Sequence, residues 1–232
     1  MDPCPEMFRD DNKKITKIHF SVRVNVATEP IVESDLRNLL IKLRKQDPRF
    51  KKCDQGMAPD GSAGIIHHRD GLRSIEMTRD RINYTESDKF DRHSFNSISK
   101  SIYEYYLDVK KVELDQIKLV GKIYFLSFDI GKPAVEWTAE RLRLYRDFTP
   151  LYFDIRTTML MDDLNLHLYV SAKSDDDDED SSPDIKVQLD VNNHNQEDGI
   201  KDDTINKVID FIDNFQKDRL IEVLNTNFGL QS

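Results

Sequence analysis

Strict alternation of apolar and polar residues constrains the fold of this chain more than any other feature. In the segment 15–26, ITKIHFSVRVNV, apolar residues occupy every second position from 18 to 26. A period of two places those side chains on one face of a β-strand. The same alternation returns in the segments 153–159, 164–170 and 185–191. The sequence therefore predicts a sheet with one buried face.

Apolar residues recur at helical spacing in the segments 36–43, 95–109 and 205–224. Each of these stripes covers one side of a helix and predicts a helix that packs on the sheet. Ser34 precedes the first stripe and is predicted to cap that helix, because its hydroxyl can accept from a free backbone N–H. A further helix is predicted around 135–145, which carries the single tryptophan.

The stretch 64–86, GIIHHRDGLRSIEMTRDRINYTE, raises the question of a catalytic or metal-binding patch. His67, His68 and Asp70 form the best histidine–carboxylate cluster in the chain. Adjacent residues on a strand point to opposite faces, so the two histidines are poorly placed to hold one ion. Asp70-Gly71 suits a hairpin turn. The stretch is therefore interpreted as a meander of two or three strands.

The predicted order is β-α-β-β-α-β followed by α-β-β-β-α, with residues 54–63 as a loop. This order indicates an α+β fold with one or two largely antiparallel sheets in two halves and a long C-terminal helix. The expected organisation begins with a polar tail, residues 1–13. Two α+β halves follow, residues 14–131 and 132–232, which could form one compact domain. The second half contains an acidic loop, residues 173–184.

Charge is strongly polarised along the chain, whose net charge is −9. Residues 175–203 hold twelve acids and two lysines, a net charge of −10, so the rest carries +1. The candidate interaction residues are the basic cluster Arg37, Lys42, Arg44, Lys45, Arg49, Lys51 and Lys52 and the acidic cluster Asp175, Asp176, Asp177, Asp178, Glu179 and Asp180. The acidic cluster could attract a basic partner, or it could shield the basic cluster of the same chain.

Several chemistries lack their sequence signature. No glycine-rich phosphate loop is present, and Cys4 and Cys53 lack the spacing of a metal site. No catalytic residue, metal or cofactor is therefore assigned. A metal-dependent nuclease is the least favoured alternative; it would use Asp184 and Lys186 with an acid at 154 or 163.

These observations favour a non-enzymatic protein that binds another macromolecule, with a protein as the favoured partner. The alternative is a nucleic-acid-binding protein that uses the basic segment 37–52. No apolar run approaches the roughly 18 residues of a membrane-spanning helix, and the start of the chain lacks an apolar leader. A cytoplasmic location is expected.

Three segments carry a resemblance to a known family: the early strand IHFSVRV, the run IEMTRDRINYTES with the helix FNSISKSIYEYY, and the closing helix VIDFIDNFQKDRLIEVL. Their order resembles a sporadically distributed bacterial α+β protein family of similar length. The chain departs from that family at Asp213-Asn214-Phe215, where a histidine is expected. The family has no established activity, so the resemblance implies no site residues. Its patchy distribution would suit a mobile or defence-associated gene, including antiviral defence.

Overall fold

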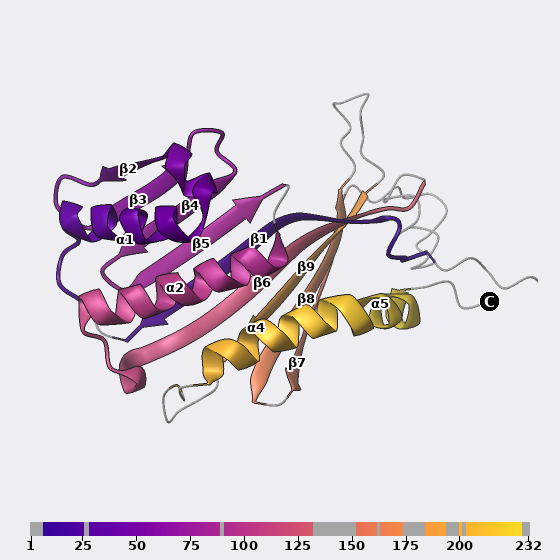
Figure 1. Ribbon diagram of the computed structural model, residues 1–232. Coiled ribbons are helices and arrows are strands. Elements are labelled where there is room, and N and C mark those ends of the chain that lie inside the picture. The colour runs from indigo at the N-terminus through magenta and orange to yellow at the C-terminus, as the bar shows by residue number, and fades with distance from the viewer. Residues whose placement is uncertain are drawn as a thin grey trace, which may run out of the picture.

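A computed structural model of the protein describes residues 7–25, 28–88, 91–131, 152–161, 163–173, 184–193, 200 and 203–228. The strands of these residues form one continuous sheet in the order β2-β3-β4-β5-β1-β6-β9-β8-β7 (Figure 1). All neighbouring strands pair antiparallel. The strands are β1 Lys13–Val24, β2 Cys53–Met57, β3 Ala63–His68, β4 Arg73–Thr78, β5 Arg81–Ser87, β6 Ile117–Asp129, β7 Tyr152–Met161, β8 Leu164–Lys173 and β9 Asp184–Asn192. The predicted large antiparallel sheet is confirmed.

The helices end in a long C-terminal helix, as predicted. They are α1 Glu33–Gln46, the 3₁₀ turn η1 Pro48–Lys52, α2 Arg92–Lys110, the 3₁₀ turn η2 Leu114–Gln116, α4 Thr204–Asn214, the π-helical turn η3 Phe215–Arg219 and α5 Leu220–Phe228. Because η3 joins α4 to α5 without a break, the three form one rod along the sheet (Figure 1).

The detailed order differs from the predicted one between the first two long helices. Four strands, β2 to β5, lie there instead of two. Residues 53–57, most of which were expected in a loop, form the edge strand β2 and pair with β3. Backbone hydrogen bonds to β3 hold this strand in place. Its sequence, CDQGM, lacks the alternation of apolar and polar residues that would have predicted a strand. The helix predicted around 135–145 lies outside the described residues.

The predicted cap of the first helix is wrong. The helix begins at Glu33, so Ser34 already lies in its first turn, and Val32 occupies the capping position. The carboxylate of Asp35 accepts from the Val32 N–H at 3.2 Å instead. At α2 the cap is Asp91, which accepts from the Ser94 N–H at 2.8 Å.

The described helices all cover one face of the sheet (Figure 1). On β1 this face carries Ile18, Phe20 and Val22, all fully buried. The opposite side, which we call the open face, carries Lys17 and His19 of β1 and the residues in register with them on the other strands. The period of two therefore predicted correctly which side chains of β1 are buried.

Pairing of β6 with β9 runs from Gly121 opposite Asn192 to Asp129 opposite Asp184. The segments 14–131 and 132–232 thus contribute to one sheet. Phe8, within the segment expected to be a polar tail, is fully buried and meets the Phe128 ring edge-on at 5.1 Å. Its backbone exchanges hydrogen bonds of 3.0 and 2.8 Å with the amide of Asn225.

Candidate functional site

The basic cluster predicted from the sequence does not form a uniform surface. Arg37 pairs with Glu33 at 2.6 Å, one turn earlier on α1. Lys42 lies 3.9 Å from Glu104 of α2 and donates to a carbonyl of that helix. Lys45, Lys51 and Lys52 are exposed, and among the described residues their side chains have no hydrogen-bond or ion-pair partner.

Two arginines of the cluster have an internal role. Arg44 donates to the carbonyl oxygens of Phe50 at 3.2 Å and Cys53 at 3.0 Å, which fixes η1 against α1. Arg49 reaches inward to Asp47 and Ser94. Their guanidinium groups are therefore already used within the fold, and the phosphate-binding surface expected from 37–52 shrinks to its lysines.

The acidic cluster at 175–180 lies outside the described residues, which leave β8 at Lys173 and resume at Asp184. Its two suggested roles, attraction of a basic partner and shielding of the basic cluster, stay hypotheses.

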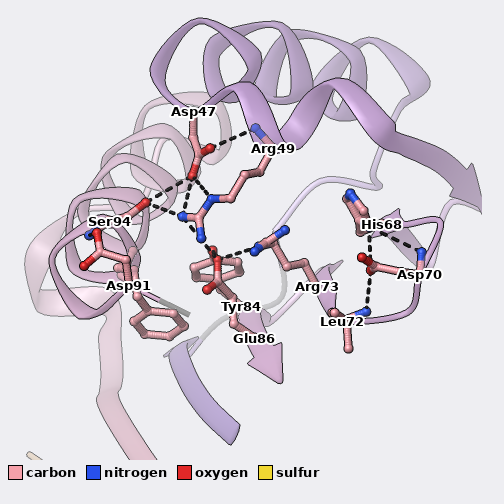
Figure 2. Close-up of polar contacts among 12 residues, drawn as sticks. Asp47, Arg49, His68, Asp70, Leu72, Arg73, Tyr84, Glu86, Asp91 and Ser94 are labelled. Atoms are coloured by element: carbon pink, nitrogen blue, oxygen red, sulfur yellow. Dashed lines mark hydrogen bonds and ion pairs between the residues drawn. The ribbon is translucent and has the colours of Figure 1, made fainter. Parts of the chain in front are cut away.

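The histidines of β3 point to opposite sides of the sheet. His67 is exposed on the open face, and His68 is buried on the helix-covered face. His68 faces Asp70 with 2.5 Å between Nδ1 and Oδ1 (Figure 2). Asp70 also accepts from the Leu72 N–H at 2.9 Å, and Gly71 adopts the left-handed conformation with φ 74°. The cluster thus stabilises a turn, as the sequence interpretation held.

Figure 2 shows a buried charge cluster where η1, α2 and the β4–β5 hairpin meet. Glu86 is fully buried; its Oε1 accepts from Arg73 Nε at 2.9 Å and from the Tyr84 hydroxyl. Arg49 approaches the same oxygen at 3.8 Å. Among the described residues, Glu86 Oε2 has no hydrogen-bond partner.

The charges of this cluster balance internally. Arg49 bridges Glu86 and Asp47, and Ser94 donates to Asp47 at 3.0 Å. Burial favours the neutral acid, but hydrogen bonds from Arg49 hold the pKa of Asp47 below its ordinary value. Two carboxylates and two guanidiniums cancel, so the cluster ties elements together and offers little charge to a ligand.

The open face carries a different arrangement, a row of side chains in register across five adjacent strands. From β7 to β1 the row consists of Arg156, Tyr169, Gln188, Phe125 and Lys17. The guanidinium of Arg156 lies 5.5 Å from the Tyr169 ring centroid, and Lys17 Nζ lies 5.3 Å from that of Phe125. Two half-buried rings, each with a cation over it, therefore flank one amide.

A pocket of about 460 Å³ opens at this row. This volume lies within the range of small-ligand sites, roughly 300 to 1,000 Å³. Its described lining comes from strands β1, β6, β7, β8 and β9: Thr16, Phe125, Leu126, Ser127, Asp154, Arg156, Tyr169, Ser171, Lys186, Val187 and Gln188. Aromatic faces, cations, hydroxyls and an amide meet in one hollow.

Two of the residues that a metal-dependent nuclease was expected to use line this pocket. Asp154 and Lys186 flank Ser171 in the register of β7, β8 and β9. Asp163 is not with them, because it lies at the β7–β8 turn with φ 65°. Within the described part of the chain, no three His, Cys, Asp or Glu side chains are grouped to hold a metal ion.

Sequence reasoning missed Phe125 and Tyr169 as site residues. The segment 117–130 is almost continuously apolar, so its period does not reveal which rings face the open side. The sequence of β8 did contain a usable signal. Asn165, His167 and Tyr169 occupy every second position, so the Tyr169 ring is expected on the polar side of the strand.

No protein-family model and no curated protein matches the sequence. Among solved structures, the substrate-free duplicated taurocyamine kinase from Schistosoma mansoni matches with 9% identity and a TM-score of 0.38, over 91% of this chain and 34% of that chain. The same kinase with bound transition state analog components matches with 8% identity and the same TM-score, over 91% and 33%. The chain spans about a third of the length of these kinase chains.

In the described part of the structure, none of the helices combines the length and the apolar character that crossing a bilayer requires.

Proposed function

We propose that this protein is a non-enzymatic binding protein for an anionic macromolecule, and that the open face of the sheet is its binding surface. The observation that carries the proposal is the row from Arg156 to Lys17 with its two cation-capped rings. A sheet face can present such a row to an extended ligand, because side chains in register stand side by side across strands.

Within the two rows of the open face that hold Phe125 and Ser127, cations outnumber carboxylates, which favours an anionic ligand. Lys14 and Lys186 both lie in register with Ser127, next to the row that holds Lys17 and Arg156. Asp154 is the one carboxylate among the described lining residues, and it accepts from Arg156 at 2.9 Å. Several cations close together raise the local concentration of a polyanion, and the resulting binding weakens as salt rises.

A second candidate, a protein partner at α1, is favoured by one specific observation. Ile41 is 45% exposed, although it is apolar, and it lies in a shallow hollow of about 580 Å³. Lys42 and Lys45 rim this hollow. An exposed apolar residue with cations around it would suit an acidic protein surface.

The test compares two charge-matched variants of the full chain. One removes three lysines of the open face, Lys14→Gln, Lys17→Gln and Lys186→Gln; the other removes Lys45, Lys51 and Lys52 in the same way. Heparin, polyphosphate and nucleic acids serve as probes at low and raised salt. We expect wild type and the second variant to bind, and the open-face variant to bind weakly.

Loss of binding in the second variant alone would move the site to the basic segment and overturn the proposal. Absence of salt-sensitive binding by wild type to every polyanion would overturn it as well, and would leave the protein partner at α1 as the better candidate.

A further inference from the structure

Resting on the proposed function, we infer that the anionic macromolecule is a single-stranded nucleic acid whose bases stack on Phe125 and Tyr169. Both rings are half-buried and line the same pocket. They belong to β6 and β8, with β9 between them. Because adjacent strands are about 4.8 Å apart, the two backbones are separated by roughly 10 Å. Two bases of one extended strand can span that distance.

The cations over the rings show which way the ring faces are turned. Lys17 lies over Phe125 and Arg156 over Tyr169, so these faces meet charged side chains instead of apolar core. A base that stacks on either face would displace the cation, and both cations are long side chains that can move aside toward a phosphate. Every nucleic-acid base has a π face, and stacking on aromatic side chains tolerates any sequence. The planar guanidinium of Arg156 can stack on a base as well.

Polar groups between the rings provide contacts to base edges. Gln188 stands between Phe125 and Tyr169 in the same row. Its amide offers both a donor and an acceptor, which is what the polar edges of bases require. Ser171, next to it in the pocket, adds a hydroxyl.

Phosphates would be held beside the rings. Lys14 and Lys186 share the register position of Ser127, two residues from Phe125 along β6. An extended strand with its bases on the rings can therefore place its backbone against these lysines. A neutral or purely apolar ligand would leave them unused.

A duplex fits this surface poorly. Its bases are stacked on one another, so their faces are not available to Phe125 and Tyr169. Duplex DNA is read mainly by a helix or a two-stranded ribbon in the major groove. The described helices cover one face of the sheet (Figure 1), and the strand registers place both rings on the other, open face.

The test measures fluorescence anisotropy of labelled oligonucleotides of about 16 nucleotides, as single-stranded DNA, single-stranded RNA and duplex. The variants are Phe125→Leu, Tyr169→Leu and their combination, in which leucine keeps apolar volume. Tyr169→Phe retains the ring. Phe211→Leu, on α4, is the matched control for loss of a ring on the other side of the sheet. Melting temperatures establish that each variant is folded.

We expect wild type, Tyr169→Phe and Phe211→Leu to bind single strands more tightly than the duplex. Each leucine substitution in the pocket should weaken single-strand binding by roughly tenfold or more, with an unchanged salt dependence. The triple lysine variant should instead reduce the slope of log affinity against log salt by about 2, or about 0.7 per lost phosphate contact.

The two proposals fail differently. If heparin and duplex bind as well as single strands, and the leucine variants bind like wild type, the stacking inference is overturned while polyanion binding by the open face stands. If no polyanion binds in a salt-sensitive manner, both are overturned.

Discussion

Lys122 Nζ of β6 lies 2.5 Å from Asp213 Oδ1 of α4, and the lysine side chain is fully buried. The Tyr124 hydroxyl donates to the same carboxylate oxygen at 2.7 Å. Asn96 of α2 accepts from the lysine and donates to the other carboxylate oxygen, both at 2.7 Å. Burial lowers the pKa of Lys122 to about 8, against the opposing attraction of Asp213. This network fastens two helices to the centre of the sheet.

Removal of the Asp213 carboxylate alone should strongly destabilise the folded protein. Asp213→Ala leaves a buried ammonium group without a counter-charge, and we expect the free energy of unfolding to fall by about 3–5 kcal/mol. Adding Lys122→Met removes the stranded charge and should restore most of the loss. Urea unfolding of the two single variants and the double variant measures both effects. A double variant as unstable as Asp213→Ala would show that charge is not the cause.

Glu86 should be the most sensitive carboxylate of the second buried cluster. Glu86→Gln keeps the shape but leaves the Arg73 guanidinium, which is 8% exposed, without its charge partner. We expect the free energy of unfolding to fall by about 3 kcal/mol. The matched control is Asp54→Asn, which breaks the exposed pair with Arg69 and should leave the urea midpoint unchanged. Equal effects of the two substitutions would contradict the role assigned to burial.

Stability should depend on pH through His19. Burial is the main cause that lowers the pKa of His19 from 6.5 to about 4. The positive charges of Lys17 and Arg81 lower this pKa as well, and the negative charge of Glu76 opposes them. The unfolded chain therefore takes up a proton as the pH falls below 6.5, while the folded protein does so only near pH 4. Full stability is present above pH 6.5 and is lost as the pH falls toward 4, by up to about 3 kcal/mol.

Urea unfolding across that pH range tests this dependence. His19→Gln should flatten the curve, because the variant has no imidazole to titrate. His67→Gln, an exposed histidine in the same row of the open face, should retain the wild-type slope. A wild-type slope in His19→Gln would assign the effect to other groups.

A side chain at Gly64 should destabilise the protein, because the buried side chain of Leu36 would have to shift. A Cβ at this position of β3 would lie 2.7 Å from Leu36 Cδ1 and 2.8 Å from Cδ2, closer than carbon atoms can approach. Gly64→Ala should therefore lower the free energy of unfolding by about 1–3 kcal/mol through overpacking. On the neighbouring strand, a Cβ at Gly56 would meet Ile65 at an ordinary 3.6 Å, so Gly56→Ala is the control. Similar melting temperatures of the two variants would contradict this account.

The sequence predicted well what depends on near neighbours in the chain. Leu36, Leu39, Leu40 and Leu43 are all buried on α1, as their spacing indicated. It failed where a backbone contact from a distant segment decides the structure. Residues 53–57 became a strand because β3 pairs with them. Arg44 and Arg49, expected on the surface as cations for a partner, donate instead to carbonyl and carboxylate oxygens of the fold, although Arg44 stays exposed.

By itself, the sequence determined which side of each amphipathic element is buried, because strand and helix periods follow from local backbone geometry. The tertiary structure alone decided which strands are neighbours. Tyr169 and Phe125 share a row with Lys17 because β8, β9, β6 and β1 lie side by side. That order is set by long-range hydrogen bonding and by packing beneath the helices, and no local pattern in the chain specifies it.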